Sequence, residues 1–400
     1  MPHDPSCARA STARVATNQD DLSPVAYAYD WLANVSTGYL SAAPPALPWP
    51  SHPPGDAAAD ANAIDVLPRA AGLPWHTGLP HARQNRHWRA ALRSSTAALE
   101  AFTLSADMER LRRADGKSLA GVAALHLRVA EADRFTKFPT YLFPEADEER
   151  AKLLGEAMVL AVVFDDLWEA HEEEKLDGIR DDFVRRLRGG VSGDEASRTE
   201  LQTLIDVVVK GFKHQDTIAG NGGQEVIDRV VDFSSHVPPR SEFKTFDEYM
   251  RYRFDDVAAP FLIAGVKFSI GSSVSIEDPK LVRIVQLAGD HISLVNDLAS
   301  FDKELREFEA GELRNLVNSV NILRKLLGLP SWSAAKAFTY AMQLELETQI
   351  RQELERLEAS NTLDAEEWRF VRALLVMVAG NVFYSTIASR YGGEAAKLPA

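Results

Sequence analysis

The chain has 400 residues, of which 46% are hydrophobic, and its 58 acidic and 44 basic side chains give a formal net charge of −14. This size can bury a large core and could in principle form two domains. The negative charge excludes a nucleic-acid binder that works through a basic face.

The single cysteine, Cys7, excludes intrachain disulfides and multi-cysteine zinc sites. The longest uninterrupted apolar runs, 157–164 and 373–379, are too short to span a bilayer, and the N-terminus lacks a signal-peptide core. We therefore expect a soluble, cytoplasmic protein with no transmembrane segment and no nucleic-acid partner.

Residues 1–85 differ in composition from the rest of the chain. Twelve of the 20 prolines lie there, in runs such as Pro48-Trp49-Pro50. Because proline fixes φ and removes a backbone donor, no long helix can pass through this region. We predict a mobile or loosely packed extension over 1–85, which Trp31, Trp49 and Trp75 could pin onto the body.

From about residue 86 onward the apolar residues recur at helical spacing. The segments with this pattern are 86–103, 117–134, 148–175, 195–219, 246–270, 278–308, 312–328, 333–358 and 363–391. Plausible N-cap residues are Asp147, Asp247 and Ser333. The sequence shows no alternating strand pattern of useful length and no internal repeat. It predicts one all-α domain over 86–400.

The most informative stretch is Asn296-Asp297-Leu298-Ala299-Ser300-Phe301-Asp302-Lys303-Glu304. On a helix, Asn296, Ser300 and Glu304 are spaced by four residues and share one face. Their amide, hydroxyl and carboxylate oxygens are hard ligands suited to Mg²⁺. The alternative is an exposed helix end of solvated charges, but Asn296 and Ser300 are poor interior helix formers, which favours the ligand interpretation.

A second acidic stretch, Phe164-Asp165-Asp166-Leu167-Trp168-Glu169, follows a run that is apolar on every side. Asp165 and Glu169 are four residues apart, so they can converge on one cation. Unpaired carboxylates at the end of a buried helix are costly, which points to a metal. The pattern also arises readily by chance, and the following Glu172-Glu173-Glu174-Lys175 is typical of a solvated face.

Cationic side chains form a third group. Arg251 and Arg253 lie early in a predicted helix, and Arg390-Tyr391 closes the last one. Arginine suits bidentate contact with phosphate oxygens, and tyrosine adds a neutral donor. The structural alternatives are an Arg253–Asp256 surface ion pair and a favourable cation at a helix C-terminus. Taken together, the three groups indicate a Mg²⁺-assisted clamp for a diphosphate, surrounded by apolar helices.

This combination resembles the class I terpene cyclases, and most closely the single-domain sesquiterpene cyclases of fungi and bacteria. The resemblance covers roughly residues 135–392. Asp165-Asp166-Leu167-Trp168-Glu169 is similar to the aspartate-rich motif, with Glu in place of the usual final Asp, and Asn296, Ser300 and Glu304 fit the second metal motif. Stretches 141–147, 315–317 and 380–391 resemble three further elements. The resemblance implies a single-domain helical bundle around a central apolar active-site cavity.

The resemblance also implies roles for individual residues. Three Mg²⁺ ions are expected. One set of ligands would be Asp165 and Glu169, and the other would be Asn296, Ser300 and Glu304. Asp166 and Asp256 are further candidate ligands. Arg253 resembles the diphosphate sensor, with Asp256 as its linker and Val257 at the effector position, although Arg251 could take the sensor role. Lys303, Arg390 and Tyr391 would donate to the diphosphate. Candidates for stabilising a carbocation are Phe164, Trp168, Phe261, Phe268, Phe383 and Tyr384.

The implied reaction is Mg²⁺-dependent ionisation and cyclisation of a linear isoprenyl diphosphate, most simply farnesyl diphosphate, by a monomer or homodimer. The alternatives are a diterpene cyclase acting on geranylgeranyl diphosphate and a prenyltransferase. A prenyltransferase typically carries a second aspartate-rich motif instead of the Asn/Ser/Glu type found here. A helical scaffold without catalytic activity is the alternative from another class.

Overall fold

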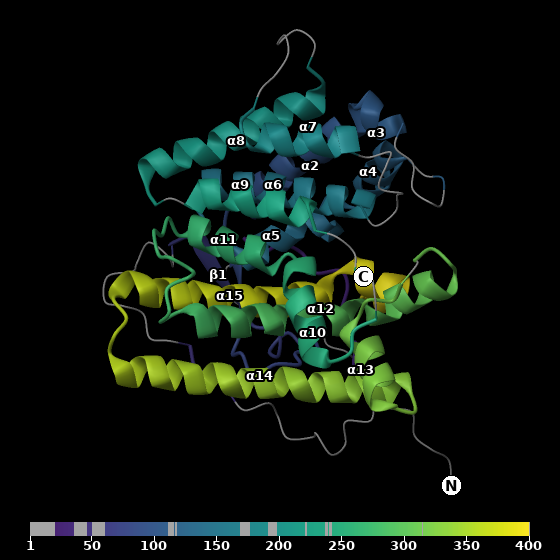
Figure 1. Cartoon of the computed structure of the whole chain (residues 1–400), viewed down its shortest axis with the longest axis vertical. Helices are drawn as coiled ribbons and strands as arrows, with labels where there is room; N and C mark the ends of the chain where they lie inside the picture. The colour runs from purple at the N-terminus through teal and green to yellow at the C-terminus, as the bar shows by residue number, and fades with distance from the viewer. Residues whose placement is uncertain are drawn as a thin grey trace.

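The structure, a computed structural model, describes residues 21–35, 46–49, 61–110, 116, 118–168, 177–190, 198–220, 222–236, 239, 242–313 and 315–399. These residues form the expected all-α architecture, a stack of helices with one two-stranded sheet (Figure 1). The α-helices are α2 (Trp88–Leu104), α3 (Ala106–Arg110), α4 (Leu119–Arg128), α5 (Phe138–Leu142), α6 (Glu148–Trp168), α7 (Asp177–Leu187), α8 (Glu200–Ile218), α9 (Gly222–Ser234), α10 (Phe246–Asp256), α11 (Ala259–Ser269), α12 (Val282–Glu309), α13 (Ser319–Leu327), α14 (Trp332–Ser360), α15 (Ala365–Ile387) and α16 (Ser389–Gly392). Short 3-10 turns cover Glu131–Asp133, Phe135–Lys137 and Gly393–Ala396.

Helices α12 and α15 form the centre of the lower half of the molecule in Figure 1. Helix α12 packs against α10, α11, α13, α14, α15 and α16, and α15 also contacts α5 and α11. Every residue from Phe370 to Ile387 of α15 is buried. Gly380 allows the close approach to α5, because a Cβ at this position would lie 2.1 Å from the carbonyl oxygen of Tyr141. By length and composition α15 could cross a membrane, but its apolar stretch is wholly buried in the bundle, as in the core helix of a soluble protein.

The predicted helix over 246–270 is wrong in one respect, since the structure divides it into α10 and α11. Helix α10 ends at Asp256, and Ala258 adopts a left-handed backbone with φ of 59°. Pro260 stands in the first turn of α11. Because proline has no N–H and its ring clashes with the carbonyl four residues earlier, the helix cannot run through this point. The break leaves Val257 at the C-terminal end of α10, where the resemblance places the effector.

Of the three expected N-caps, one is confirmed and two are wrong. The Asp147 carboxylate accepts a hydrogen bond from Arg150 N at 2.9 Å, as an N-cap of α6 should. The cap of α10 is Thr245 rather than Asp247, and the cap of α14 is Ser331 rather than Ser333. In both errors the true cap is a hydroxyl residue two positions earlier.

Parts of the proline-rich region are described and lie against the bundle. Strands β1 (Ala63–Val66) and β2 (Ala82–Asn85) pair in antiparallel register, although the sequence showed no strand pattern. Four-residue strands are too short to produce a convincing alternation. Trp31 and Trp75 are both buried, so these two tryptophans do pin their segments onto the body.

Candidate active site

The predicted metal-binding face, formed by Asn296, Ser300 and Glu304, lies on α12. The three side chains differ in their burial and in their hydrogen-bond partners. Ser300 is buried, and its Oγ forms no hydrogen bond of standard geometry among the described residues, although it lies close enough to the Glu304 carboxylate to offset part of the rise that burial causes in the pKa of that group. Glu304 is partly buried, and burial raises the pKa of its carboxyl above the usual value, against the opposing charge of Arg253. An unpartnered hydroxyl one turn from a carboxylate in a buried setting is costly without a ligand. The face is therefore suited to a hard cation.

Arg253 on α10 reaches this face directly. Its Nη2 donates to Asn296 Oδ1 at 2.8 Å, and its Nε donates to Asp297 Oδ1 at 2.9 Å. Gly289 permits this approach of the two helices, since a Cβ there would lie 2.1 Å from the Phe254 ring. Arg251, in contrast, is exposed and pairs with Asp247 at 2.9 Å. Of the two arginines that the sequence left open, only Arg253 lies at the metal motif.

Asp256 lies beside Arg253 rather than on the metal face. It accepts hydrogen bonds from Arg253 Nη1 and from Tyr252 OH, the latter at 2.7 Å, and His236 Nε2 lies 3.5 Å away. Although burial opposes ionisation, the charge of Arg253 and these neighbours lower the pKa of Asp256 to about 2. The geometry places Asp256 behind the guanidinium, where it fixes the orientation of Arg253.

Asp297, for which the sequence suggested no role, is the centre of a buried network. Its side chain is fully buried and accepts hydrogen bonds from Tyr249 OH at 2.5 Å, Arg253 Nε at 2.9 Å and Ser319 N at 2.8 Å. Burial and the adjacent Asp297 carboxylate raise the pKa of Tyr249 well above its usual value, so its hydroxyl stays a donor. Asp297 thus ties α10 and the start of α13 to α12.

Asn318, the N-cap of α13, is a second residue that the sequence did not identify. Its Nδ2 donates to Asp297 O at 2.9 Å and to Glu304 Oε2 at 3.0 Å. Its Oδ1 accepts from Val320 N, which caps the helix. An Asn directly before an apolar helical run is a recognisable cap signal, but its second contact, across to Glu304, is visible only in three dimensions.

The C-terminal element reaches the same face through Tyr391. Asn296 Nδ2 donates to the Tyr391 hydroxyl at 3.3 Å, and burial raises the pKa of Tyr391. Arg390 is exposed on α16. Lys303 lies next to Glu304 in α12 and forms an ion pair with Glu307 at 2.7 Å. The structure thus brings Tyr391 into direct contact with the metal motif and leaves Arg390 and Lys303 at its edge.

The aspartate-rich motif occupies the end of α6. Asp165 and Asp166 lie in the last turn of this helix, but their side chains, and Glu169 altogether, lie outside the described residues. Among the residues that are described, no three His, Cys, Asp or Glu side chains cluster as a metal site. The donors of α12 are of a different kind, because two of its three expected ligands are an amide and a hydroxyl.

Two of the six aromatic candidates, Phe164 and Tyr384, lie in different environments. Phe164 is buried and stacks on Phe183 with a centroid separation of 3.8 Å, while Phe102 meets its edge at 5.5 Å. This arrangement is ordinary core packing between α2, α6 and α7. The Tyr384 ring centroid lies 6.3 Å from that of Tyr391, the residue that contacts Asn296.

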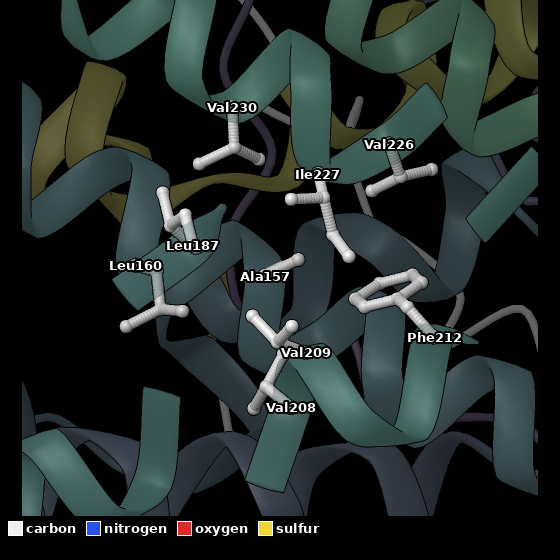
Figure 2. Close-up of a pocket in the computed structure, with 9 residues that line it drawn as sticks. All are labelled: Ala157, Leu160, Leu187, Val208, Val209, Phe212, Val226, Ile227 and Val230. Carbon is white, nitrogen blue, oxygen red and sulfur yellow. The ribbon is translucent and has the colours of Figure 1, made fainter. Parts of the chain in front are cut away.

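A separate apolar pocket lies between α6, α7, α8 and α9 (Figure 2). It is small, with room for no more than about one water molecule. Its lining residues are all apolar: Ala157, Leu160, Leu187, Val208, Val209, Phe212, Val226, Ile227 and Val230. None of the metal-motif residues lines it. Its wall nevertheless includes α6, the helix that carries Asp165 at its end.

Comparisons with known proteins match the region of the chain that contains these residues. The family described as "Terpene synthase family 2, C-terminal metal binding" matches residues 235–348, which contain Arg253, Asn296 and Glu304. The chain is 26% identical over 340 residues to Terpene cyclase 6 of Gibberella fujikuroi, covering 82% of this chain and 85% of that one. It is 25% identical over 262 residues to aristolochene synthase of Aspergillus terreus, covering 64% and 80%. Relatives named as diterpene synthases are also among the matches.

Solved structures show the same fold. Aristolochene synthase from Penicillium roqueforti superposes with a TM-score of 0.57 at 18% identity, covering 74% of this chain and 95% of that one. The helical architecture, the metal-binding family and the relatives in sequence lead to one assignment. Together these findings support a class I terpene cyclase, an enzyme of the terpene synthase type.

Proposed function

We propose that the enzyme ionises farnesyl diphosphate in a Mg²⁺-dependent reaction and cyclises the resulting cation to a sesquiterpene hydrocarbon or alcohol. The observation that carries this proposal is the contact of Arg253 with both Asn296 and Asp297 at 2.8 and 2.9 Å. A buried guanidinium directly beside hard oxygen ligands is suited to a diphosphate bridged by metal ions. The relative from Aspergillus terreus named aristolochene synthase supports a fifteen-carbon substrate.

Three Mg²⁺ ions would be held by two sets of residues. Asn296, Ser300 and Glu304 would hold one ion, and Asp165 with Glu169 would hold the others, with Asp166 as a further candidate ligand. The bound ions would neutralise the negative charge that develops on the departing diphosphate. Asn296 Oδ1 accepts from Arg253 in this structure. Arg253 must therefore share or release that oxygen when the metal binds.

The chain's own residues would act mainly on the leaving group. Arg253, Lys303, Arg390 and Tyr391 would donate hydrogen bonds to the diphosphate oxygens, which stabilises charge as the carbon–oxygen bond breaks. The bonding electron pair leaves with the diphosphate, and an allylic cation remains. Cyclisation ends with loss of a proton to give an alkene, or with capture of water to give an alcohol. Tyr384 lies where an aromatic face could stabilise the cation near the diphosphate.

The test is release of diphosphate from C10, C15 and C20 isoprenyl diphosphates with Mg²⁺, with chelator as the control, and product analysis by gas chromatography with mass detection. We expect cyclic C15 products only when Mg²⁺ is present. Cyclic products from the C20 substrate alone would replace this proposal with a diterpene cyclase. Chain elongation on addition of isopentenyl diphosphate would identify a prenyltransferase instead. No diphosphate release from any substrate would contradict the proposal.

A further inference from the structure

Residues 21–35, which we call the N-terminal strap, run alongside the end of the chain. Ala28 N donates to Ala396 O at 2.8 Å, and Leu398 N donates to Ala26 O at 2.8 Å. The strap therefore pairs with the segment that directly follows α16. Nothing in the sequence of this proline-rich region indicated such a contact, because its partner lies more than 360 residues away.

One residue of the strap, Tyr29, contacts both the C-terminal element around α16 and helix α12. Its backbone N donates to Thr386 O in the last turn of α15 at 2.7 Å. Its side chain lies against Gly392, where an added Cβ would come within 2.9 Å of Tyr29 Cβ. Its hydroxyl donates to Asp302 Oδ2 on α12 at 2.7 Å. Tyr29 thus connects the element that carries Arg390-Tyr391 with the helix that carries the metal motif.

The partner of this hydroxyl, Asp302, lies between Ser300 and Glu304 in the chain. Both of its oxygens accept from Lys336 Nζ of α14 at 2.7 Å. Burial, followed by the hydrogen bond to Asp302, raises the pKa of Tyr29, so the phenol remains a donor over the working pH range. Asp302 is therefore held from two sides, by the strap and by α14, and its backbone can shift only if both contacts yield.

Helix α12 is consequently attached to the C-terminal element at two points. Asn296 contacts Tyr391 directly. Asp302 lies about 9 Å further along the helix axis and is linked to the C-terminal element through Tyr29. Two contacts on one helix fix its rotation as well as its position. We propose that Tyr29 is a positioning residue that sets the metal-binding turn of α12 against the Arg390-Tyr391 element, a role that rests on the function proposed above.

The competing explanation is that Tyr29 only holds the strap in place. Tyr27 provides a matched control, because its hydroxyl also lies on the strap but donates to Glu394 at 3.3 Å, away from α12. The variants Tyr29→Phe and Tyr27→Phe each remove one hydroxyl and keep the ring. A purely structural role would change the thermal midpoint of both variants without changing the Mg²⁺ dependence of either.

Two quantities are measured on the full-length protein. The first is the affinity for inorganic diphosphate in the presence of Mg²⁺, determined by titration calorimetry. The second is the Mg²⁺ concentration that gives half-maximal diphosphate release. We expect Tyr29→Phe to lower the affinity for diphosphate and to raise the required Mg²⁺ concentration, each by about tenfold, as loss of a supporting partner typically does. We expect Tyr27→Phe to match the wild type in both quantities. Equal values for Tyr29→Phe and the wild type, within twofold, would overturn the proposal. An equal loss in both variants would also overturn it.

Two further results keep this test independent of folding and of the proposed reaction. If Tyr29→Phe does not fold, hydrogen exchange on the wild type replaces it. Addition of Mg²⁺ and diphosphate should slow exchange of the Tyr29 and Leu398 amides, and unchanged exchange would contradict the proposal. If the wild type neither binds diphosphate nor releases it from any isoprenyl substrate, the proposed function fails. A functional wild type with an unaffected Tyr29→Phe variant refutes the positioning role alone.

Discussion

Two buried regions of the molecule differ in what they bury. The pocket between α6, α7, α8 and α9 is lined entirely by aliphatic and aromatic side chains. The α12 face instead buries Asp297 and Ser300 and receives Arg253 from α10. Apolar burial stabilises a fold in proportion to the area removed from water, so the pocket region needs no explanation beyond folding.

The α12 region does need another explanation. A buried ion pair is at best weakly stabilising relative to well-packed apolar residues of similar volume, and an orphaned hydroxyl such as that of Ser300 is destabilising. A ligand can satisfy such groups where they lie together with charged side chains, as Ser300 does one turn from Glu304 on α12. The contrast predicts that substitutions on the α12 side change catalysis, metal dependence or the pH dependence of stability, whereas substitutions around the pocket change stability and leave metal dependence unchanged.

The largest expected effect is that of Arg253→Lys. Lysine keeps the charge but loses the fork that contacts Asn296 and Asp297 together, so we expect diphosphate release to fall by about a hundredfold. Arg251→Lys is the matched control, because Arg251 is exposed and pairs with Asp247 on its own helix. Steady-state rates with farnesyl diphosphate measure the effect. Comparable losses of rate in both variants would show that the contacts of Arg253 with Asn296 and Asp297 do not matter for diphosphate release.

Asp256→Asn tests the electrostatics behind Arg253. The folded pKa of about 2 lies below the usual value of 3.8, so the carboxylate stabilises the fold above pH 5 and loses this contribution as pH falls towards 2. We expect the variant to lose about 2 kcal/mol of unfolding free energy at pH 7, and the difference from wild type to shrink by about 1 kcal/mol at pH 3. Urea unfolding at pH 7, 5 and 3 measures this, and a difference independent of pH would contradict it.

Ser300→Ala separates ligand binding from stability. Because Ser300 Oγ forms no hydrogen bond of standard geometry among the described residues, its removal should leave the thermal midpoint unchanged or raise it slightly. The Mg²⁺ concentration for half-maximal activity should rise by about tenfold. Ser385→Ala on α15 removes another buried hydroxyl without a partner and should leave the Mg²⁺ dependence unchanged. A Ser300 variant with normal Mg²⁺ dependence would remove this residue from the ligand set.

The smallest effect is expected from the apolar region. Ile227→Val deletes one methylene from the pocket wall and should lower the unfolding free energy by about 1 kcal/mol. The Mg²⁺ dependence should stay at its wild-type value. Chemical denaturation and the same Mg²⁺ titration measure both quantities. A shift in Mg²⁺ dependence would show that the two regions are coupled through α6.

The sequence predicted those features that repeat along one helix. The spacing of Asn296, Ser300 and Glu304 could be recognised because a four-residue interval places side chains on one face. Apolar periodicity likewise located most of the long helices, but α7 and α9 lie outside the predicted segments. The break between α10 and α11 was missed because the periodicity continues through it, although Pro260 was a visible signal.

Contacts between distant segments could not be predicted in this way. Asp297 looked like one more charge in an acidic run, and only the packed structure shows that Tyr249, Arg253 and Ser319 converge on it. Tyr29 is a stronger case, since its partner Asp302 is 273 residues away. Periodicity describes the face of one element, whereas these residues act by joining elements.

The central claim is that the α12 face binds the Mg²⁺ needed for diphosphate departure. The most direct measurement is Mg²⁺-dependent release of diphosphate from farnesyl diphosphate by the wild type and by Asn296→Ala, with thermal midpoints confirming that both are folded. We predict release and cyclic products from the wild type, and at least about a hundredfold slower release from the variant. Equal release by a folded Asn296→Ala variant, or none by the wild type, would contradict the claim.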